Sequence, residues 1–564
     1  MKLILQSFKS GDTYLTDSPC PSISNTEVLI RTNCSLISSG TERMLVNFGK
    51  SNLIEKIRQQ PDKVNLALNK IKTDGLLATY EILSRKLDEP ISLGYCNAGR
   101  ILELGSNSSS LKVGDRVVSN GAHSEVVGVP INLCAKIPDN VNDEAASFTV
   151  IGAIALQGMR LVKPTLGEAV VVMGLGLVGQ ITVQLLRANG CRVLGMDFDG
   201  AKLELAKSFG AEIVDLNNIE DPLNVADRFS RSRGVDAVII TASTTSNDPI
   251  HLAAKMSRNR GRIVLVGNTG LELSRDDFFQ KELTFQVSAS YGPGRYDENY
   301  EIGGHDYPVG HVRWTAQRNF EAILDMMASG QLNTDRLISH KFTLNQVDEA
   351  YSVVCSSEYS MGILFKYPFC DEYSDDIVRS NLVSISPPPK RQRVNSSPSV
   401  GFIGAGNYAN AILVPSFKKT GALLSIIASK TGVSAIILGK KYSFRDATSD
   451  ADMVIEAHNI DAVVISTRHN SHTKLVLQSL HSKKHIFVEK PLCLKLEELF
   501  EIERAYKKIA EEVNYLPILM VGFNRRFAPQ IRKIKSLLDI VGGPKSFIMT
   551  INAGKLPSLI DPFY

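Results

Sequence analysis

The sequence of 564 residues lacks a long apolar segment, since no uninterrupted apolar stretch reaches the roughly 18 residues that a membrane-spanning helix needs. It also has little net charge. The 63 Lys and Arg residues nearly balance the 59 Asp and Glu residues, which leaves a formal net charge of +4. Acidic and basic residues are interspersed, so the charge gives no reason to expect nucleic acid or a membrane surface as a partner.

Cysteine is sparse and unclustered. The chain has eight cysteines and no Cys-x-x-Cys motif, a pattern that does not indicate a disulfide framework in a chain of this length. The N-terminal run Met1-Lys-Leu-Ile-Leu-Gln6 is too short for a signal peptide and is predicted to be a first strand. We therefore expect a cytoplasmic protein.

What the sequence does contain is two glycine-rich turns, at 174–179 and 404–409, each between an apolar β-run and a helix-like run. Such a turn lets the backbone approach a pyrophosphate, while the helix N-terminus supplies N–H donors. The residues of the two motifs are Gly174, Gly176, Gly179, Gly404, Gly406 and Ala409. Two such turns predict two dinucleotide sites on one chain, and with them two redox centres.

The alternation of strands and helices predicts an α/β protein with two Rossmann-type doubly wound parallel sheets, in residues 151–290 and 400–530. Short β-runs separated by turns predict a small β-barrel in residues 1–150. The chain is expected to return to this barrel over residues 291–366. Residues 367–399 are rich in proline, serine and charge, which is typical of a linker.

Three segments do not fit the main units. A charged, helix-prone stretch at 53–86 interrupts the predicted barrel. The cluster Lys390-Arg391-Gln-Arg393 could be a nuclear or nucleic-acid signal, although a solvated linker is the favoured interpretation. Residues 531–564 are expected to begin a further domain that the chain does not complete.

The strand that follows each turn predicts the cofactor. The first such strand ends at Asp197, 18 residues beyond Gly179, where a carboxylate binds ribose hydroxyls and repels a 2′-phosphate. NAD is therefore expected in the first site. The equivalent strand of the second sheet ends at Ser429-Lys430 without an acid, and these side chains can bind a 2′-phosphate. NAD or NADP is expected there.

The order barrel, nucleotide sheet, barrel resembles the medium-chain dehydrogenase/reductase family, often called zinc-type alcohol dehydrogenases. The resemblance covers about residues 1–366 and includes Val113–Val117, the first glycine turn, and Asp197 with Lys202. It implies a GroES-like catalytic barrel beside the nucleotide sheet. It also implies that Lys202 takes part in cofactor binding.

The resemblance fails at the family's catalytic zinc. The three ligand positions fall near Ser38, Tyr95 and Thr149, and Gly94-Tyr95-Cys96 stands where the family has Gly-His-Glu. A catalytic zinc needs three ligands of Cys, His or carboxylate type, so we expect no metal here. The family's four-cysteine structural zinc lobe is also missing. Tyr95 is the candidate for polarising the carbonyl and carrying the proton; the alternative is that it only contacts the nicotinamide.

The second sheet carries Glu489-Lys490-Pro491 about 85 residues past its glycine turn. This arrangement resembles the glucose–fructose oxidoreductase/inositol dehydrogenase (Gfo/Idh/MocA) family, in which the tripeptide ends the fifth strand and often contains a cis peptide. By resemblance, Lys490 is the catalytic residue that reaches the substrate hydroxyl; the alternative is an exposed lysine at a strand–loop junction. The candidate cofactor contacts are Thr467, Asn470, His472 and Glu489.

That family continues into a substrate domain with a catalytic histidine. The last histidine here is His485, so the second centre is expected to be incomplete. The whole order, with the segments 291–297, 304–308, 312–315 and 521–527, resembles the bacterial bi-domain oxidoreductases. Those proteins fuse the two families and are often linked with surface-polysaccharide biosynthesis.

The resemblance implies an NAD(P)-dependent oxidoreductase, expected to be a homo-oligomer, that acts on a sugar, nucleotide sugar or polyol. A non-catalytic nucleotide sensor or scaffold is the alternative. The absence of the zinc ligands and of a C-terminal histidine favours the sensor. The complete nucleotide motifs and Glu489-Lys490-Pro491 disfavour it. The fold alone names neither the substrate nor the direction of hydride transfer.

Overall fold

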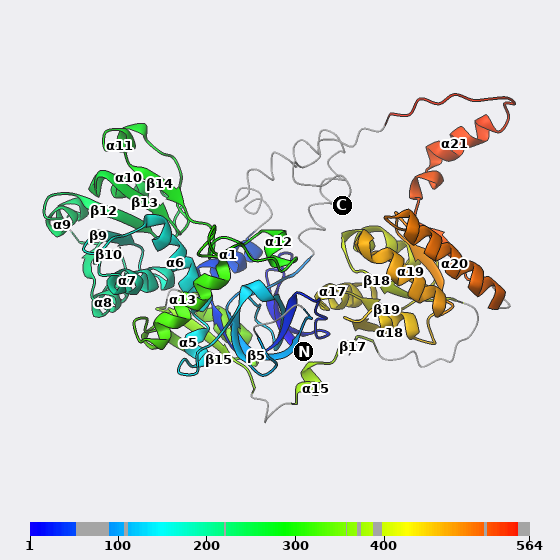
Figure 1. Cartoon of the computed structure of the whole chain (residues 1–564), viewed down its shortest axis with the longest axis horizontal. Coiled ribbons are helices and arrows are strands. Elements are labelled where there is room, and N and C mark those ends of the chain that lie inside the picture. The colour runs from blue at the N-terminus through cyan, green and yellow to red at the C-terminus, as the bar shows by residue number, and fades with distance from the viewer. Residues whose placement is uncertain are drawn as a thin grey trace. The chain divides into compact units, whose positions relative to one another are not determined.

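The computed structural model describes residues 1–51, 89–106, 111–218, 221–356, 358–368, 374–386, 397–512 and 516–550. These form two compact units, Met1–Ser380 and Asn381–Tyr564, whose elements are labelled in Figure 1. The helix-prone stretch at 53–86 and the basic cluster at 390–393 lie outside the described residues. Within the described ranges, no helix is both long and apolar enough to cross a membrane.

The first unit begins with two sheets. Strands β1 (Lys2–Gln6), β2 (Thr13–Asp17) and β4 (Ile91–Ser92) make a small antiparallel sheet. A seven-stranded sheet has the order β15-β16-β3-β5-β6-β8, with β7 also paired to β3. An isolated bridge joins Leu3 of β1 to Ser124, which lies between β6 and β7, and closure into a barrel stays a prediction.

The strands of the larger sheet come from both ends of the first unit. They are β3 (Glu27–Ile37), β5 (Asn97–Leu104), β6 (Arg116–Ser119), β7 (Val126–Pro130), β8 (Cys134–Lys136), β15 (Ile338–Thr343) and β16 (Gly362–Lys366). Strand β16 pairs antiparallel with β3, so the chain returns to the N-terminal sheet after the nucleotide sheet. Helix α14 (Val347–Cys355) precedes this return.

The nucleotide sheet of the first unit has six parallel strands in the order β11-β10-β9-β12-β13-β14. The strands are β9 (Ala169–Met173), β10 (Arg192–Asp197), β11 (Glu212–Asp215), β12 (Val235–Ile240), β13 (Ser257–Leu265) and β14 (Thr284–Val287). The order reverses between β9 and β12. In doubly wound sheets, ligands bind in the crevice at such a switch point, outside the carboxyl ends of the strands.

Strand β9 shows why the sheet is buried on both faces. Val170 and Val172 join one apolar cluster, whereas Val171 and Met173 join another on the opposite face. This alternation follows from the two-residue period of a strand. Helices α7 (Leu177–Ala188), α8 (Gly200–Ser208), α9 (Pro222–Phe229) and α10 (Asp248–Met256) cover the faces (Figure 1).

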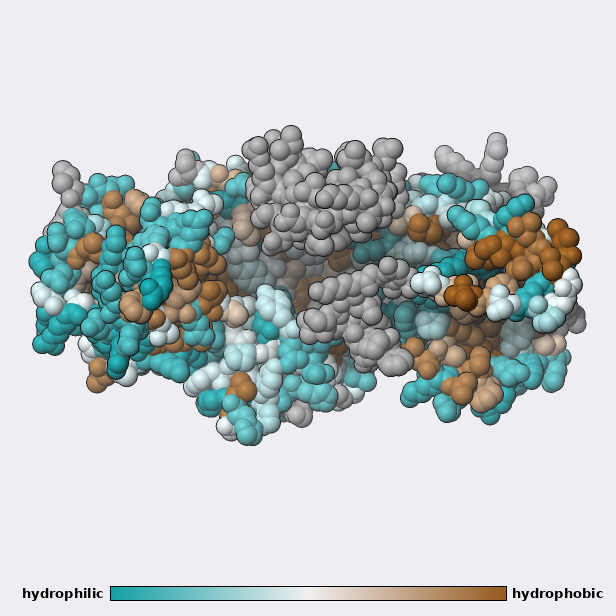
Figure 2. Space-filling view, turned by 90° about the horizontal axis from the view of Figure 1, so that it is seen from above, coloured by the Kyte–Doolittle hydropathy of each residue, from teal (hydrophilic) through white to brown (hydrophobic). Residues whose placement is uncertain are grey.

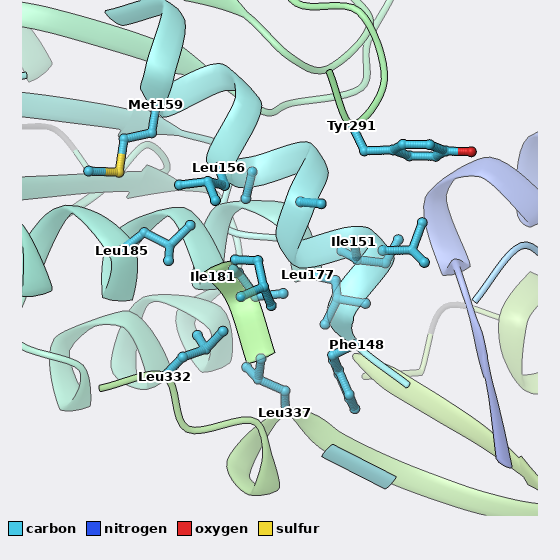
Figure 3. Packing of buried hydrophobic residues seen from close by; sticks show 14 of the residues in the cluster. Phe148, Ile151, Leu156, Met159, Leu177, Ile181, Leu185, Tyr291, Leu332 and Leu337 are labelled. Carbon is cyan, nitrogen blue, oxygen red and sulfur yellow. The ribbon is translucent and has the colours of Figure 1, made fainter. Parts of the chain in front are cut away.

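Helix α6 (Thr149–Val162) joins the nucleotide sheet to the N-terminal sheets. It is apolar around most of its circumference and largely buried, as expected for a helix that contacts neighbours on several sides. It lies against α7 and α13 (Ala316–Ala328), and Figure 3 shows Ile151 and Leu156 among the buried side chains. A fixed α6 holds Thr149 at the boundary between the two parts of the unit.

The second unit repeats the doubly wound pattern. Its sheet has the order β17-β20-β19-β18-β21-β22-β23, in which only the edge strand β17 is antiparallel. The strands are β17 (Leu382–Ser384), β18 (Ser399–Ile403), β19 (Leu423–Ala428), β20 (Asp446–Thr448), β21 (Ala462–Ile465), β22 (His485–Val488) and β23 (Leu519–Val521). The two predicted Rossmann sheets are thus confirmed. The sequence reading missed β11 and β20, since each has at most four residues and carries charge.

The predicted linker contains ordered elements. Helix α15 (Asp375–Val378) is held to the first unit because Asp375 pairs with Arg31 and Arg100. Strand β17 pairs with β20 and so belongs to the second sheet. Residues 379–381 separate α15 from β17. Local composition did not predict α15 and β17, because α15 is held by Arg31 and Arg100 and β17 by pairing with β20, all far away in the sequence.

The second unit ends with α20 (Leu496–Glu512) and α21 (Pro529–Leu538). Apolar side chains on and after α21 are exposed, and Figure 2 shows hydrophobic residues at the surface on the right of the view. The exposed apolar side chains on and after α21 are Ile534, Leu537, Ile540, Val541, Phe547, Ile548 and Met549. The structure shows no partner for this surface among the described residues.

Candidate functional site

The first glycine turn joins β9 to α7. Gly174 has a φ of +91°, and a Cβ there would lie 2.6 Å from the backbone nitrogen of Ala242. A Cβ on Gly179 would lie 2.1 Å from the carbonyl oxygen of Gly174. At Gly176 a Cβ would meet nothing within 4 Å. Gly174 and Gly179 are therefore required by the fold, while Gly176 leaves an open approach for a pyrophosphate.

Asp197, at the end of β10, lies at the mouth of this turn. Its Oδ2 accepts a hydrogen bond from Leu175 N–H at 2.6 Å, and its Oδ1 accepts from Phe198 N–H at 2.8 Å. Lys202 is also close, but its ammonium pairs with Asp199 at 3.3 Å. The predicted acid therefore lies against the glycine turn, and its binding of a ribose stays a prediction.

Thr241 is a residue of this turn that the sequence reading missed. It follows β12, and its hydroxyl donates to the Gly174 carbonyl at 2.5 Å and to the Met173 carbonyl at 3.2 Å. The hydroxyl thus fixes the turn from the neighbouring strand across the switch point. The available signal was a hydroxyl side chain directly after an apolar strand.

Tyr95 and Ser38, two of the three residues at the family's zinc positions, are in contact. The Tyr95 hydroxyl donates to Ser38 Oγ at 2.6 Å and lies 3.3 Å from Thr41 Oγ1. Burial raises the pKa of Tyr95, so its phenol stays protonated at physiological pH. The third residue, Thr149, has a buried hydroxyl without a hydrogen-bond partner in the described part of the chain.

Asn120 and Tyr291 add polar groups that the sequence reading did not select. Strands β5 and β6 pair with Asn97 opposite Ser119, and Asn120 directly follows this last pair. Its Nδ2 donates to the Tyr291 hydroxyl at 3.3 Å, while its Oδ1 is buried and has no partner in the described chain. Figure 3 shows the Tyr291 hydroxyl directed away from the labelled apolar side chains.

These donors do not fit zinc. Over the described ranges, no three His, Cys, Asp or Glu side chains converge as metal ligands would. Burial raises the pKa of the Cys96 thiol well above its usual value, which disfavours the thiolate that binds metal. Hydroxyl groups and a neutral phenol are poor zinc ligands.

The second glycine turn has the same construction. Gly404 has a φ of +105°, and a Cβ there would lie 2.6 Å from the Ser466 carbonyl. The Ser466 hydroxyl donates to the Gly404 carbonyl at 3.0 Å, as Thr241 does in the first turn. Gly406 is open on its Cβ side. Ala409 is buried, and the helix there begins with a π turn, Ala409–Leu413.

The end of β19 offers a hydroxyl and an exposed ammonium. Ser429 Oγ accepts a hydrogen bond from Ala435 N–H at 3.0 Å, near the start of α17 (Val433–Tyr442). Lys430 is exposed beside it. No carboxylate occupies the position that Asp197 has in the first site, so a 2′-phosphate remains permitted.

The predicted contacts after β21 divide into two groups. Asn470 is exposed, and the Thr467 hydroxyl bonds to Ser471 Oγ at 2.6 Å. His472 is fully buried, with Nδ1 2.7 Å from the Pro491 carbonyl and Nε2 3.2 Å from the Thr467 carbonyl. Both ring nitrogens thus face the protein, and His472 supports the loops rather than presenting a nitrogen to a nucleotide.

Glu489-Lys490-Pro491 follows β22, and the Lys490–Pro491 peptide is cis. Burial raises the pKa of Glu489, whose Oε1 is buried without a partner in the described residues. Lys490 is exposed. Burial and then the charges of His472 and Lys490 lower the pKa of His469, a basic group that the sequence reading did not select. The tripeptide thus presents an ammonium and an unsatisfied carboxylate oxygen at the edge of the sheet.

Comparison with known proteins matches both units. Residues 178–302 match a family described as zinc-binding dehydrogenase, and residues 399–514 match an oxidoreductase family with an NAD-binding Rossmann fold, the Gfo/Idh/MocA family. (R,R)-butanediol dehydrogenase of Bacillus subtilis is 24% identical over 307 residues, which cover 49% of this chain and 81% of that protein. D-guloside 3-dehydrogenase of Escherichia coli is 28% identical over 269 residues, covering 46% and 72%.

Solved structures show the same fold. Galactitol-1-phosphate dehydrogenase from Escherichia coli superposes with a TM-score of 0.51 at 18% identity, covering 65% of this chain and 100% of that chain. An alcohol dehydrogenase from Thermus gives 0.50 at 19% identity, with the same two coverages. The matches identify an NAD(P)-dependent oxidoreductase of dehydrogenase type. The family description as zinc-binding does not support the expected absence of zinc, which rests on the residues alone.

Proposed function

We propose that this chain, which joins a medium-chain dehydrogenase to a Gfo/Idh/MocA-type oxidoreductase unit, transfers hydride between NAD(H) and a carbinol carbon of a sugar, nucleotide sugar or polyol. The observation that carries the proposal is the chemistry of the side chains at the three expected zinc positions and at Asn120. They are uncharged hydroxyl, phenol and amide groups, and the Asn120 and Thr149 oxygens lack partners in the described chain. Unpaired groups of this kind suit a substrate with several hydroxyl groups.

The names of the relatives support this substrate class. They include dehydrogenases of a butanediol, an arabitol phosphate, an idonate and a guloside. Asp197 supports NAD in the first site, because its carboxylate repels a 2′-phosphate. The resemblance to bi-domain oxidoreductases favours a cytoplasmic homo-oligomer in surface-polysaccharide biosynthesis.

The reaction in the first site is proposed to proceed without zinc. When bound, NAD(H) supplies or accepts the hydride at the substrate carbon. In the direction of reduction, the neutral phenol of Tyr95 donates its proton to the substrate oxygen. Ser38 and Thr41, both within hydrogen-bond distance of that phenol, then return a proton to it from solvent.

The second unit is proposed to bind NAD or NADP through Gly404, Gly406 and the helix after them. The unsatisfied Oε1 of Glu489 supports a polar ligand at this edge, since a buried acceptor without a donor costs free energy. Lys490 is proposed to reach the substrate hydroxyl there, as the family resemblance implies.

A non-catalytic nucleotide sensor is the second candidate, favoured by the absence of metal-type donors at Ser38, Tyr95 and Thr149. A hydride-exchange screen separates the two functions. The purified chain is mixed with inositols, sugars and nucleotide sugars, each with NAD and with NADP. Exchange with NAD that Tyr95→Phe reduces, while the exposed-residue control Tyr296→Phe does not, supports the enzyme. Tight binding of both cofactors without exchange in any mixture would establish the sensor.

A further inference from the structure

A buried carboxylate and imidazole lie beneath the Tyr95–Ser38 hydrogen bond. Glu42, in the first turn of α1 (Ser39–Lys50), is 1% exposed, and His123 is 0% exposed. His123 Nε2 lies 3.2 and 3.3 Å from the two Glu42 oxygens. Removing such a pair from water costs free energy that its mutual attraction often does no more than offset, so the pair is not by itself evidence of a stabilising role.

Glu42 is bonded on both of its oxygens. Its Oε1 accepts from Ser38 N–H at 2.9 Å, and its Oε2 accepts from the Tyr351 hydroxyl at 2.5 Å. The first of these bonds fixes the backbone of Ser38, whose hydroxyl oxygen accepts the hydrogen bond from the Tyr95 phenol. The carboxylate is thus one hydrogen bond away from the residue that orients the phenol.

His123 reaches Tyr95 by a second route. Gly94, directly before Tyr95, has a φ of +88°, and a Cβ there would lie 2.6 Å from His123 Cδ2. The backbone that carries Tyr95 therefore rests on the imidazole ring. The ring is fixed in turn, because its Nδ1 lies 2.7 Å from Ser35 Oγ, which is 3.0 Å from the Tyr367 hydroxyl.

We propose that Glu42 and His123 are positioning residues for Tyr95. Glu42 holds the hydroxyl end of the tyrosine through Ser38, and His123 holds its backbone through Gly94. The fully bonded network leaves the phenol one orientation, with its oxygen between Ser38 and Thr41. The inference rests on the proposed function in one respect, namely that Tyr95 exchanges a proton with the substrate.

The Glu42 carboxylate offers an internal control. Tyr351 bonds Oε2, whereas Ser38 bonds Oε1, so Tyr351→Phe removes a hydrogen bond from the same carboxylate while both Ser38 and His123 keep their own contacts with Glu42. If Glu42 serves only the stability of the fold, Glu42→Gln and Tyr351→Phe will both lower the melting temperature and leave Tyr95 unchanged. If Glu42 positions Tyr95, only Glu42→Gln will change the environment of the Tyr95 ring.

Fluorine NMR of the full chain labelled with 3-fluorotyrosine measures this directly, with the Tyr95 signal assigned by its loss in Tyr95→Phe. We expect Glu42→Gln and His123→Asn each to shift or broaden that signal, and Tyr351→Phe to leave it in place. Ser35→Ala is the milder variant if either of the first two does not fold, and it should give a smaller shift in the same signal. An unchanged Tyr95 signal in the folded variants would overturn the proposal.

Turnover supplies a second measurement, on the substrate that the hydride-exchange screen yields. Glu42→Gln should lower kcat by about 10-fold or more, leave KM for NAD unchanged, and have no further effect in a Tyr95→Phe background. Equal losses in both backgrounds would contradict positioning. If the variants shift the Tyr95 fluorine signal but no substrate is turned over, the proposed function is wrong and the positioning role stands. If a substrate is turned over but the Tyr95 signal does not shift in the variants, the positioning role is wrong and the proposed function stands.

Discussion

The Asp197 carboxylate accepts a hydrogen bond from the Leu175 N–H at 2.6 Å. This bond ties the acid at the end of β10 to the second residue of the glycine turn, 22 positions earlier in the chain. The acid proposed to select the cofactor and the turn proposed to bind its pyrophosphate are therefore held together by a hydrogen bond.

Asp197→Ala should lower NADH affinity in the first site by about 10-fold and reduce the preference over NADPH, because the ribose loses an acceptor and a 2′-phosphate loses a repelling charge. Fluorescence titration in a Gly406→Ala background confines the measurement to the first site. Asp221→Ala is the matched control, since Asp221 also accepts a backbone bond, from Leu223 at 3.0 Å, at the start of α9. Equal affinity of the parent for NADPH would contradict the assignment.

Gly179→Ala and Gly176→Ala should fail in different ways. A methyl group on Gly179 would clash with the Gly174 carbonyl, so we expect the first unit to lose about 1–3 kcal/mol of unfolding free energy together with NADH binding. Gly176→Ala meets open space, so it should leave stability unchanged and weaken NADH binding alone. Gly310→Ala, also in open space but outside the turn, is the control. Denaturant unfolding and NADH titration on the same samples distinguish the cases.

The purified protein should hold no stoichiometric zinc after dialysis, because the family resemblance puts Ser38, Tyr95 and Thr149 at the three ligand positions and none of them is a good zinc ligand. Elemental analysis of the full chain checks this. Cofactor titration in parallel confirms that the same sample is folded. One tightly bound zinc per chain would show that other side chains bind the metal.

The first unit should lose stability in alkali. Burial raises the pKa of Tyr95, Tyr291, Tyr351 and Tyr367 above the usual value of about 10. A raised folded-state pKa means that the stabilising contribution is complete below pH 10 and is lost as the pH rises beyond it, when the unfolded chain ionises first. Urea unfolding followed by the fluorescence of Trp314, the single tryptophan, measures the slope.

Tyr95→Phe should flatten that alkaline slope, since it removes one of the groups that ionise on unfolding. The exposed Tyr296→Phe is the control and should leave the slope unchanged. A parent protein whose stability stays constant from pH 9 to pH 11 would contradict the burial of these phenols.

Lys490→Ala should raise the pKa of His469. Burial lowers that pKa first, and the charges of His472 and Lys490 lower it further. Removing a nearby positive charge favours the imidazolium form. Histidine signals in a proton NMR titration of the full chain report the change, with His469→Gln for assignment. Lys474→Ala, exposed on α19 (His472–His481), should leave the titration unchanged, and a lowered His469 pKa in Lys490→Ala would be incompatible with the geometry.

The sequence alone determined the two Rossmann sheets and their glycine turns. These features are local: an apolar strand, glycines at fixed offsets and an acid at the end of the next strand lie within a single stretch of chain. Asp197 could be chosen for the same reason. The short strands β11 and β20 escaped because four or fewer residues carry little periodic signal.

Tertiary structure decided everything that depends on distant partners. Glu42 contacts His123, 81 positions away in the sequence, and Tyr351, 309 positions away. Neither contact can be predicted from the local sequence. His472 was predicted to contact the cofactor, yet both of its ring nitrogens lie against backbone carbonyls of the protein. A motif fixes the path of the backbone through short-range sterics, whereas the direction and protonation of a side chain follow from the groups that the fold brings against it.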